Sequence, residues 1–230
     1  MFANFDFDVI LRSLPYLFYQ GMTFTVLLTV LATLGGIVIG TLLALMRLSR
    51  FAFLTVPAAA YVNLMRSVPF VLMIFWFYFL VPYIGQWITL SPRPLQVGAF
   101  TSCVVTFTLF EAAFFCEIMR AGIQSIPRGQ LAAAQALGMT YPTTMGYVIL
   151  PQAFRNMVPV LLTQTIVLFQ DTSLVYVISV TDFLGAASKV AQRDGRLVEM
   201  YLFAACVYFV ISLTASRAVQ HLQRRIAIIR

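Results

Sequence analysis

The sequence predicts an all-α integral membrane protein with about five transmembrane helices. Hydrophobic residues make up 61% of the 230 residues and charged residues 10%, whereas an ordinary soluble domain carries about 25% charged residues. Two long segments, 13–46 and 67–92, contain no charged residue. A helix that crosses a bilayer needs about 20 mostly apolar residues, because its backbone polar groups must be satisfied within the segment. A soluble fold has no need of two such segments.

The apolar runs predict five spans within a single membrane domain that covers residues 1–230. They lie at about 19–45, 55–84, 95–119, 151–178 and 197–218. The first span is rich in β-branched residues and glycine, which membrane helices tolerate. The second contains Arg66, Ser67 and Pro69, and the proline predicts either a kink or a short helix that leads into a steeper one. Pro151 opens the fourth span, and a basic tail follows the fifth.

The segment 120–150 is too polar to cross a membrane and too regularly patterned to be a slack linker. Residues 131–137 are strong helix formers, Gly138 permits the left-handed turn that ends a helix, and Pro142 suits the first turn of another. We therefore expect two short helices joined by a glycine turn. An exposed elbow of this kind suits docking of a partner, but periodicity alone favours an interfacial amphipathic loop without a partner.

The net charge of +7 comes mainly from arginines at the ends of the apolar runs, as expected for loops retained in the cytoplasm. With the N-terminus outside and the C-terminus cytoplasmic, nine basic residues fall inside and five outside. The inner set is Arg47, Arg50, Arg120, Arg128, Arg155, Arg217, Arg224, Arg225 and Arg230, and the outer set is Arg12, Arg93, Lys189, Arg193 and Arg196. No continuous basic face with interleaved aromatic residues is present, so the sequence argues against nucleic-acid binding.

The sequence offers no candidate catalytic or metal-binding residues. Cys103, Cys116 and Cys206 lie in apolar stretches without metal-ligand spacing, and we interpret them as small buried hydrophobic residues. The only histidine, His221, lies in the basic tail. A membrane-embedded enzyme would need paired carboxylates, a histidine cluster or an activated nucleophile. The sequence also lacks a G-x-x-x-x-G-K-[ST] phosphate loop.

Polar residues within the spans are costly and tend to line a pathway or join helices. In the fourth span Thr163 and Gln170 are seven residues apart, as are Gln164 and Asp171, and the two pairs form one stripe. The stripe can be interpreted equally well as the lining of a central path or as a contact between helices. Near the end of the third span, Glu117 and Arg120 are placed to form a structural pair on one helical face.

The segment Ala132, Ala133, Ala134, with Gly138 and then Leu150 and Pro151, resembles the EAA loop of binding-protein-dependent ABC importer permeases. Further motifs resemble the polar amino-acid subfamily, closest to glutamate/aspartate permease subunits. They include Arg66-Ser-Val-Pro-Phe70, Glu117-Ile-Met-Arg120, Glu111-Ala-Ala113 and Asp171-Thr172-Ser173-Leu174. One departure concerns Ala132, which stands where the glutamate of the EAA loop is expected. Docking of the ATPase would then depend on the shape of the loop around Gly138 and on the apolar face of the loop.

This resemblance implies a type I ABC importer permease fold in the bacterial inner membrane, with residues 120–150 as a cytoplasmic coupling loop. It implies three partners: a cytoplasmic ATPase that binds ATP and Mg, a periplasmic amino-acid-binding protein, and a second permease subunit, identical or not. The chain would form the path for glutamate or aspartate and bind no cofactor. Candidate path residues are Arg66, Thr163, Gln164, Gln170, Asp171, Thr172 and Ser173. We interpret Arg66 as a structural residue first and as a substrate ligand second. Import of another polar amino acid, or a self-contained secondary carrier, are the alternatives.

Overall fold

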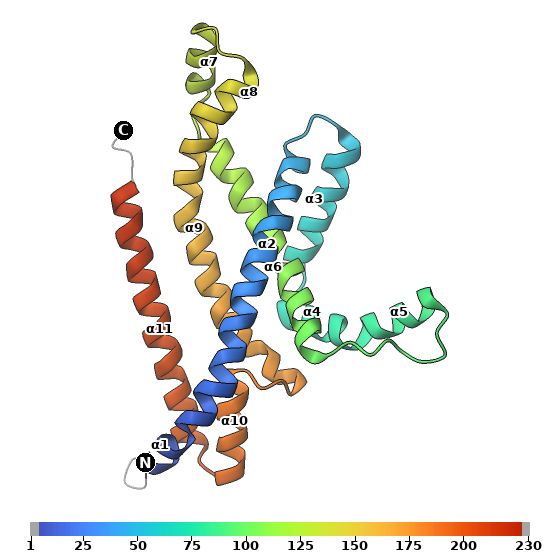
Figure 1. Ribbon diagram of the computed structural model, residues 1–230, viewed down its shortest axis with the longest axis vertical. Helices are drawn as coiled ribbons and strands as arrows, with labels where there is room; N and C mark the ends of the chain where they lie inside the picture. Colours follow the sequence, from blue (N-terminus) through green and yellow to red (C-terminus); the bar gives the residue numbers. More distant parts are fainter. Residues whose placement is uncertain (1–4, 227–230) are drawn as a thin grey trace.

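The structure, a computed structural model, describes residues 5–226, so Arg230 of the basic tail lies outside the described residues. Within this range the chain forms helices and no strand, which confirms the all-α prediction. Four long helices run along the molecule (Figure 1): α2 (Thr23–Arg47), α6 (Ala99–Gln124), α9 (Leu150–Asp171) and α11 (Leu197–Ile226). All four lie roughly along the long axis of the molecule and give the molecule its length.

Five helical segments of the described chain are long and apolar enough to cross a membrane. They are Phe7–Arg47, Phe70–Thr89, Ala99–Gln124, Tyr141–Ile178 and Leu197–Ile226. The first begins earlier than predicted because α1 (Phe7–Tyr16) continues through the π-helical turn η1 (Leu17–Met22) directly into α2. The carboxylate of Asp6 caps α1 by accepting hydrogen bonds from the backbone N–H groups of Asp8 and Val9.

The region predicted as a second span at 55–84 is divided into separate helices. Helix α3 (Ala52–Ser67) ends before Val68, whose backbone is extended (φ −104°, ψ 136°) because it precedes Pro69. Helix α4 (Phe70–Phe75), the π-helical turn η2 (Trp76–Leu80) and α5 (Val81–Thr89) follow. In Figure 1 they turn away from the long helices and form a side arm. The proline therefore produces a break and a change of direction.

Small residues allow α2 to lie directly against α6. Ala32, Gly36, Gly40 and Ala44 recur every four residues and are buried, so they share one face of α2. A Cβ atom added to Gly40 would lie 2.9 Å from the carbonyl oxygen of Ala112 and 3.0 Å from a backbone nitrogen of α6. Lipid tails are as apolar as leucine, so membrane helices associate through such close van der Waals packing.

The opposite face of α2 carries large apolar side chains that remain exposed, including Val30, Leu34, Val38 and Leu42. An apolar surface of this kind is suited to contact with lipid. Cys103 and Cys116 are buried as predicted, but the prediction is wrong for Cys206, which is exposed on α11. In a bilayer an apolar residue can face outward as readily as inward, so hydrophobicity does not decide burial.

The two ends of the bundle carry different elements (Figure 1). At one end are α7 (Arg128–Ala136), α8 (Tyr141–Thr144) and the π-helical turn η3 (Met145–Ile149). At the other are α1, the 3-10 helix η4 (Thr172–Ile178) and α10 (Phe183–Asp194). The carboxylate of Asp182 caps α10 by accepting from Leu184 N at 3.0 Å and Gly185 N at 2.8 Å.

Replacing Gly40 by valine should separate α2 from α6, because the atoms in the way are backbone atoms of Ala112 and Cys116 and the Cβ of Phe115, none of which can rotate aside. Overpacking of this kind costs about 1–3 kcal/mol. We expect a lower thermal unfolding midpoint for the purified chain in detergent. Gly146→Ala is the matched control, since nothing lies within 4 Å of the added Cβ. A Gly40→Val chain as stable as the control would contradict the packing described.

Asp182 predicts a pH dependence of stability. Burial raises its pKa to about 6 from 3.8, although its hydrogen bonds from Gly185 and Leu184 oppose this shift. The folded chain therefore holds the proton more tightly, and this contribution is complete below pH 3.8 and lost as the pH rises through about 6. Asp182→Asn should remove this dependence and keep a cap, whereas Asp182→Ala should lose about 1 kcal/mol. Unfolding midpoints measured across this pH range test both statements; parallel profiles for wild type and Asp182→Asn would disprove the first.

Candidate functional site

The connection between α6 and α9 folds into the predicted elbow of two short helices, α7 and α8. Helix α7 ends in a Schellman motif, in which Met139 N donates to Ala134 O at 3.1 Å and Gly138 N to Gln135 O at 2.9 Å. Gly138 has the left-handed φ of +79° that this motif requires. Pro142 lies in the first turn of α8, where its missing N–H costs nothing. The local sequence thus accounts for both ends of the turn.

The elbow presents apolar side chains away from the rest of the molecule. Ala132, Ala133 and Gly138 are exposed, whereas Ala134 is buried and cannot contact a partner directly. Leu150 and Pro151, which begin α9, are exposed as well. Sequence reasoning did not single out three larger exposed residues: Leu137, Tyr141 and Tyr147, with 83%, 61% and 81% of their surface exposed. Large apolar residues in a segment too polar to span a membrane were the available signal.

One carboxylate, Glu117 on α6, joins the ends of three helices. The predicted pair with Arg120 is present, with Arg120 Nη2 2.7 Å from Glu117 Oε2. Arg47 at the end of α2 also donates to Glu117 Oε1, and Arg66 at the end of α3 lies 3.8 Å from the same oxygen. The last two partners are far from Glu117 in sequence, so helical spacing could not identify them. The cluster carries one negative and three positive charges.

Arg66 is the most exposed of the three arginines. Its guanidinium group lies 5.5 Å from the centre of the Phe114 ring, a cation–π contact that holds it against α6. With 44% of its side chain exposed, it can also present positive charge to the space beside α3 and α6. The structure therefore gives Arg66 a structural contact and leaves it accessible.

The predicted polar stripe on α9 divides into residues with different surroundings. Gln164 Nε2 donates to Glu111 Oε2 on α6 at 3.1 Å, and Glu111 is completely buried. Thr172 is buried and donates to the carbonyl oxygen of Phe169. Thr163 and Gln170 are exposed, and Thr163 donates to the carbonyl oxygen of Pro159 within α9. Gln164 therefore makes a polar contact between helices, whereas the exposed side chains of Thr163 and Gln170 remain available to line a path.

Asp171 and Ser173, the other two candidate path residues, are partly buried where α9 passes into η4. Glu111 is the intramembrane acid that sequence reasoning left without a role, although its charge within an apolar run was a visible signal. No group of three or more histidine, cysteine, aspartate or glutamate residues among those described is placed to hold a metal ion.

The site thus belongs to a helical membrane protein with a rigid elbow at one end and polar residues along two of its spans. Over residues 36–228 the chain matches the family described as binding-protein-dependent transport system inner membrane component. It is 55% identical over 225 residues to the glutamate/aspartate import permease protein GltK of Escherichia coli O157:H7, covering 97% of this chain and 99% of that protein. The glutamine transport system permease protein GlnP of Escherichia coli K12 is 32% identical, covering 98% and 100%.

Two solved structures share the fold of this chain. A crystal structure of an amino acid ABC transporter with histidines has a TM-score of 0.85 and 33% identity, covering 96% of this chain and 98% of that one. An inward-facing structure of the MetNI methionine ABC transporter has a TM-score of 0.74 at 20% identity, covering 93% and 97%, and shares the fold. The chain belongs to the family of binding-protein-dependent transport system inner membrane components. Membership implies an ATPase and a substrate-binding protein as partners.

Replacing Glu117 by glutamine should destabilise the chain, because the guanidinium groups of Arg47, Arg66 and Arg120 would lose their common counter-charge. Breaking a buried pair in this way costs about 3–5 kcal/mol, and partial exposure should reduce this to about 2–3 kcal/mol. The thermal midpoint in detergent provides the measurement. Arg120→Gln is the comparison, since it leaves Glu117 two arginines and should cost less. Equal stability of the Glu117→Gln chain and wild type would show that the cluster contributes nothing.

Proposed function

We propose that this chain is the transmembrane subunit of an ATP-driven importer of glutamate or aspartate. The observation that carries the substrate is the 55% identity to a glutamate/aspartate import permease over nearly the full length of both chains. Identity to the glutamine permease over a similar length is 32%, which supports the shared transport mechanism and favours the acidic substrates. Another polar amino acid is the alternative within the same family.

Transport would require partners that supply energy and substrate. ATP and Mg would bind to a separate cytoplasmic ATPase, and a periplasmic protein would deliver the amino acid. A second permease subunit, identical or different, would complete the path. The exposed face of the elbow, with Ala132, Ala133, Gly138 and Leu137, would dock on the ATPase. Leu150 and Pro151 would carry the movement into α9, while the buried Ala134 would hold α7 in place.

Orientation in the inner membrane follows from the charges. In Figure 1 the elbow, the α2–α3 connection and the C-terminal end of α11 lie toward one end of the bundle. Arg47, Arg50 and Arg128 belong to that end, and loops rich in arginine are retained in the cytoplasm. The elbow and the C-terminus would therefore be cytoplasmic, and α1 and α10 would lie on the outer side.

Two contacts would couple the elbow to the path. The hydrogen bond between Gln164 and Glu111 links α9 to α6, the two helices that the elbow connects. The Glu117 cluster ties the end of α6 to α2 and α3. Thr163 and Gln170, one face of α9, would line the path with Asp171 and Ser173 at its outer end. Arg66 would attract an acidic substrate from beside the cluster.

Uptake by proteoliposomes tests the function. The chain, reconstituted with its ATPase and binding protein, should accumulate labelled glutamate only when both partners and ATP are present. Gly138→Val should weaken ATPase association about tenfold, because a β-branched residue at a left-handed φ is strained by about 1–3 kcal/mol. Association is measured by co-purification and titration.

Gly129→Ala is the control for this variant, since it also lies on the elbow and an added Cβ meets nothing within 4 Å. It should associate as the wild type does. Unchanged association of the Gly138→Val chain would refute the role given to the elbow. Uptake by the chain alone would instead identify a self-contained carrier.

A further inference from the structure

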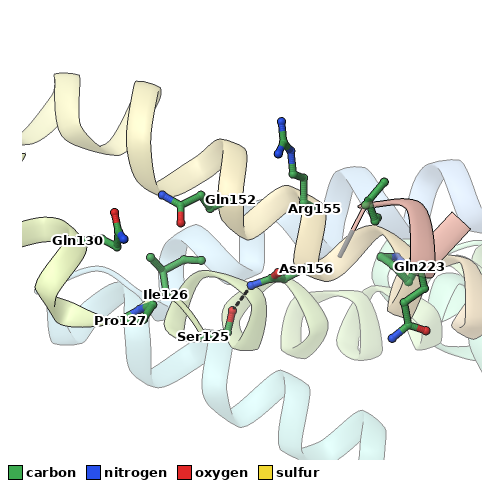
Figure 2. Close-up of a pocket in the computed structure, with 10 residues that line it drawn as sticks. Ser125, Ile126, Pro127, Gln130, Gln152, Arg155, Asn156 and Gln223 are labelled. Atoms are coloured by element: carbon green, nitrogen blue, oxygen red, sulfur yellow. Dashed lines mark hydrogen bonds between the residues drawn. The ribbon is translucent and has the colours of Figure 1, made fainter. Parts of the chain in front are cut away.

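A polar cavity of about 590 Å³ lies where the end of α6, the start of α7, the first turns of α9 and the last turns of α11 come together. Figure 2 shows the side chains that line it. The polar ones are Ser125, Gln130, Gln152, Arg155, Asn156 and Gln223. No carboxylate stands among the described residues that line this cavity, whereas amide and guanidinium N–H donors come from three helices. Such a lining is suited to an anion.

Arg155 supplies the charge of this cavity. It forms no ion pair or hydrogen bond within the described chain, in contrast to the arginines around Glu117. In Figure 2 its exposed side chain projects from α9 away from Ser125 and Asn156, whereas Asn156 turns inward and donates to Ser125 Oγ at 2.9 Å. A long, uncommitted guanidinium group can turn toward a ligand without giving up an existing partner.

An apolar groove of about 420 Å³ between α6 and α9 adjoins the polar cavity. Ser125 and Asn156 line both spaces, so the two adjoin at the hydrogen bond between these side chains. The groove is otherwise lined largely by Ile118, Ala121, Gly122, Met157 and Val160, and it runs from the elbow end toward the middle of the helices. Glu117 lies at its far end, but three arginines pair with that carboxylate. A polar cavity beside an apolar groove matches an amphiphile.

We propose that these two adjoining spaces bind one anionic phospholipid, with its phosphate beside Arg155 and one acyl chain in the groove between α6 and α9. Guanidinium and amide N–H groups hydrogen-bond phosphate oxygens. Arg224 and Arg225 in the last turn of α11 add positive charge near the same end, which attracts anionic lipid. Inorganic phosphate shares the headgroup chemistry but would leave the groove empty.

The assignment of this lipid to the cytoplasmic leaflet rests on the proposed function, which sets the orientation. Binding itself does not depend on transport. A lipid held here would contact the base of the elbow through Gln130 and the start of α9 through Gln152. It would therefore stabilise the junction through which movement of the elbow reaches the membrane helices.

The test measures lipid retention by the full-length chain, purified from vesicles of phosphatidylcholine and phosphatidylglycerol, by native mass spectrometry. The wild type should retain phosphatidylglycerol in preference to phosphatidylcholine. Arg155→Gln should lower that retention about tenfold, as expected for the loss of a hydrogen bond to a charged group. Arg50→Gln is the matched control: it makes the same charge change in the α2–α3 connection, outside both spaces, and should retain the lipid.

A second variant separates lipid from free anion. Val160→Asn, at a half-exposed position in the groove, should weaken phosphatidylglycerol retention without changing the binding of inorganic phosphate. Retention unaffected by Arg155→Gln, or lowered equally by Arg50→Gln, would overturn the proposal. Phosphate binding that depends on Arg155, together with lipid retention that ignores Val160→Asn, would identify a free-anion site and also overturn it. None of these readouts requires uptake, so failure of the importer assignment would leave them unchanged.

Discussion

Glycine and alanine on one face of α2 let its backbone touch that of α6, and this contact organises the rest of the membrane region. Ala32, Gly36, Gly40 and Ala44 are all buried there, and Gly36 lies against the side chains of Phe115 and Glu111. Within lipid, no hydrophobic driving force brings two apolar helices together, so the fit of the surfaces must do so. Once α2 is fixed against α6, its last residue, Arg47, reaches Glu117, and α3 returns to bring Arg66 to the same carboxylate.

Helices α6 and α9 form one mechanical unit with the elbow between them. The covalent connection runs through α7 and α8, and the Schellman turn at Gly138 gives that connection a defined shape. Inside the bundle the same two helices meet again through Gln164 and the buried Glu111. Under the proposed function, a displacement of the elbow would reach the interior through these two helices and their hydrogen bond. The polar cavity lies at the base of the elbow, where α6, α7 and α9 meet.

Polar residues on a single helix can have different structural surroundings. Along α9, Gln164 donates a hydrogen bond to Glu111 on α6, whereas Thr163 and Thr172 donate to nearby backbone carbonyl oxygens of Pro159 and Phe169. Thr163 and Gln170 are exposed and Thr172 is buried. The seven-residue spacings from Thr163 to Gln170 and from Gln164 to Asp171 could not predict which of these side chains would be exposed. Under the proposed function, these exposed residues would face the path that a second permease subunit completes.

Composition and charge-free length were sufficient to predict a helical membrane protein, since a bilayer admits few alternatives. The local sequence was sufficient to predict the elbow, because Gly138 and Pro142 determine the conformation of their own backbone. It was also sufficient to predict the Glu117–Arg120 pair, because residues three apart lie on the same face of a helix. The break at Pro69 was predicted, but the sideways direction of α4 and α5 was not. Tertiary structure alone brought Arg47 and Arg66 to Glu117, joined Gln164 to Glu111, buried Ala134 and left Cys206 exposed. These outcomes depend on which helices become neighbours, and in a membrane the face that meets protein and the face that meets lipid are equally apolar, so the pattern along one helix does not tell them apart.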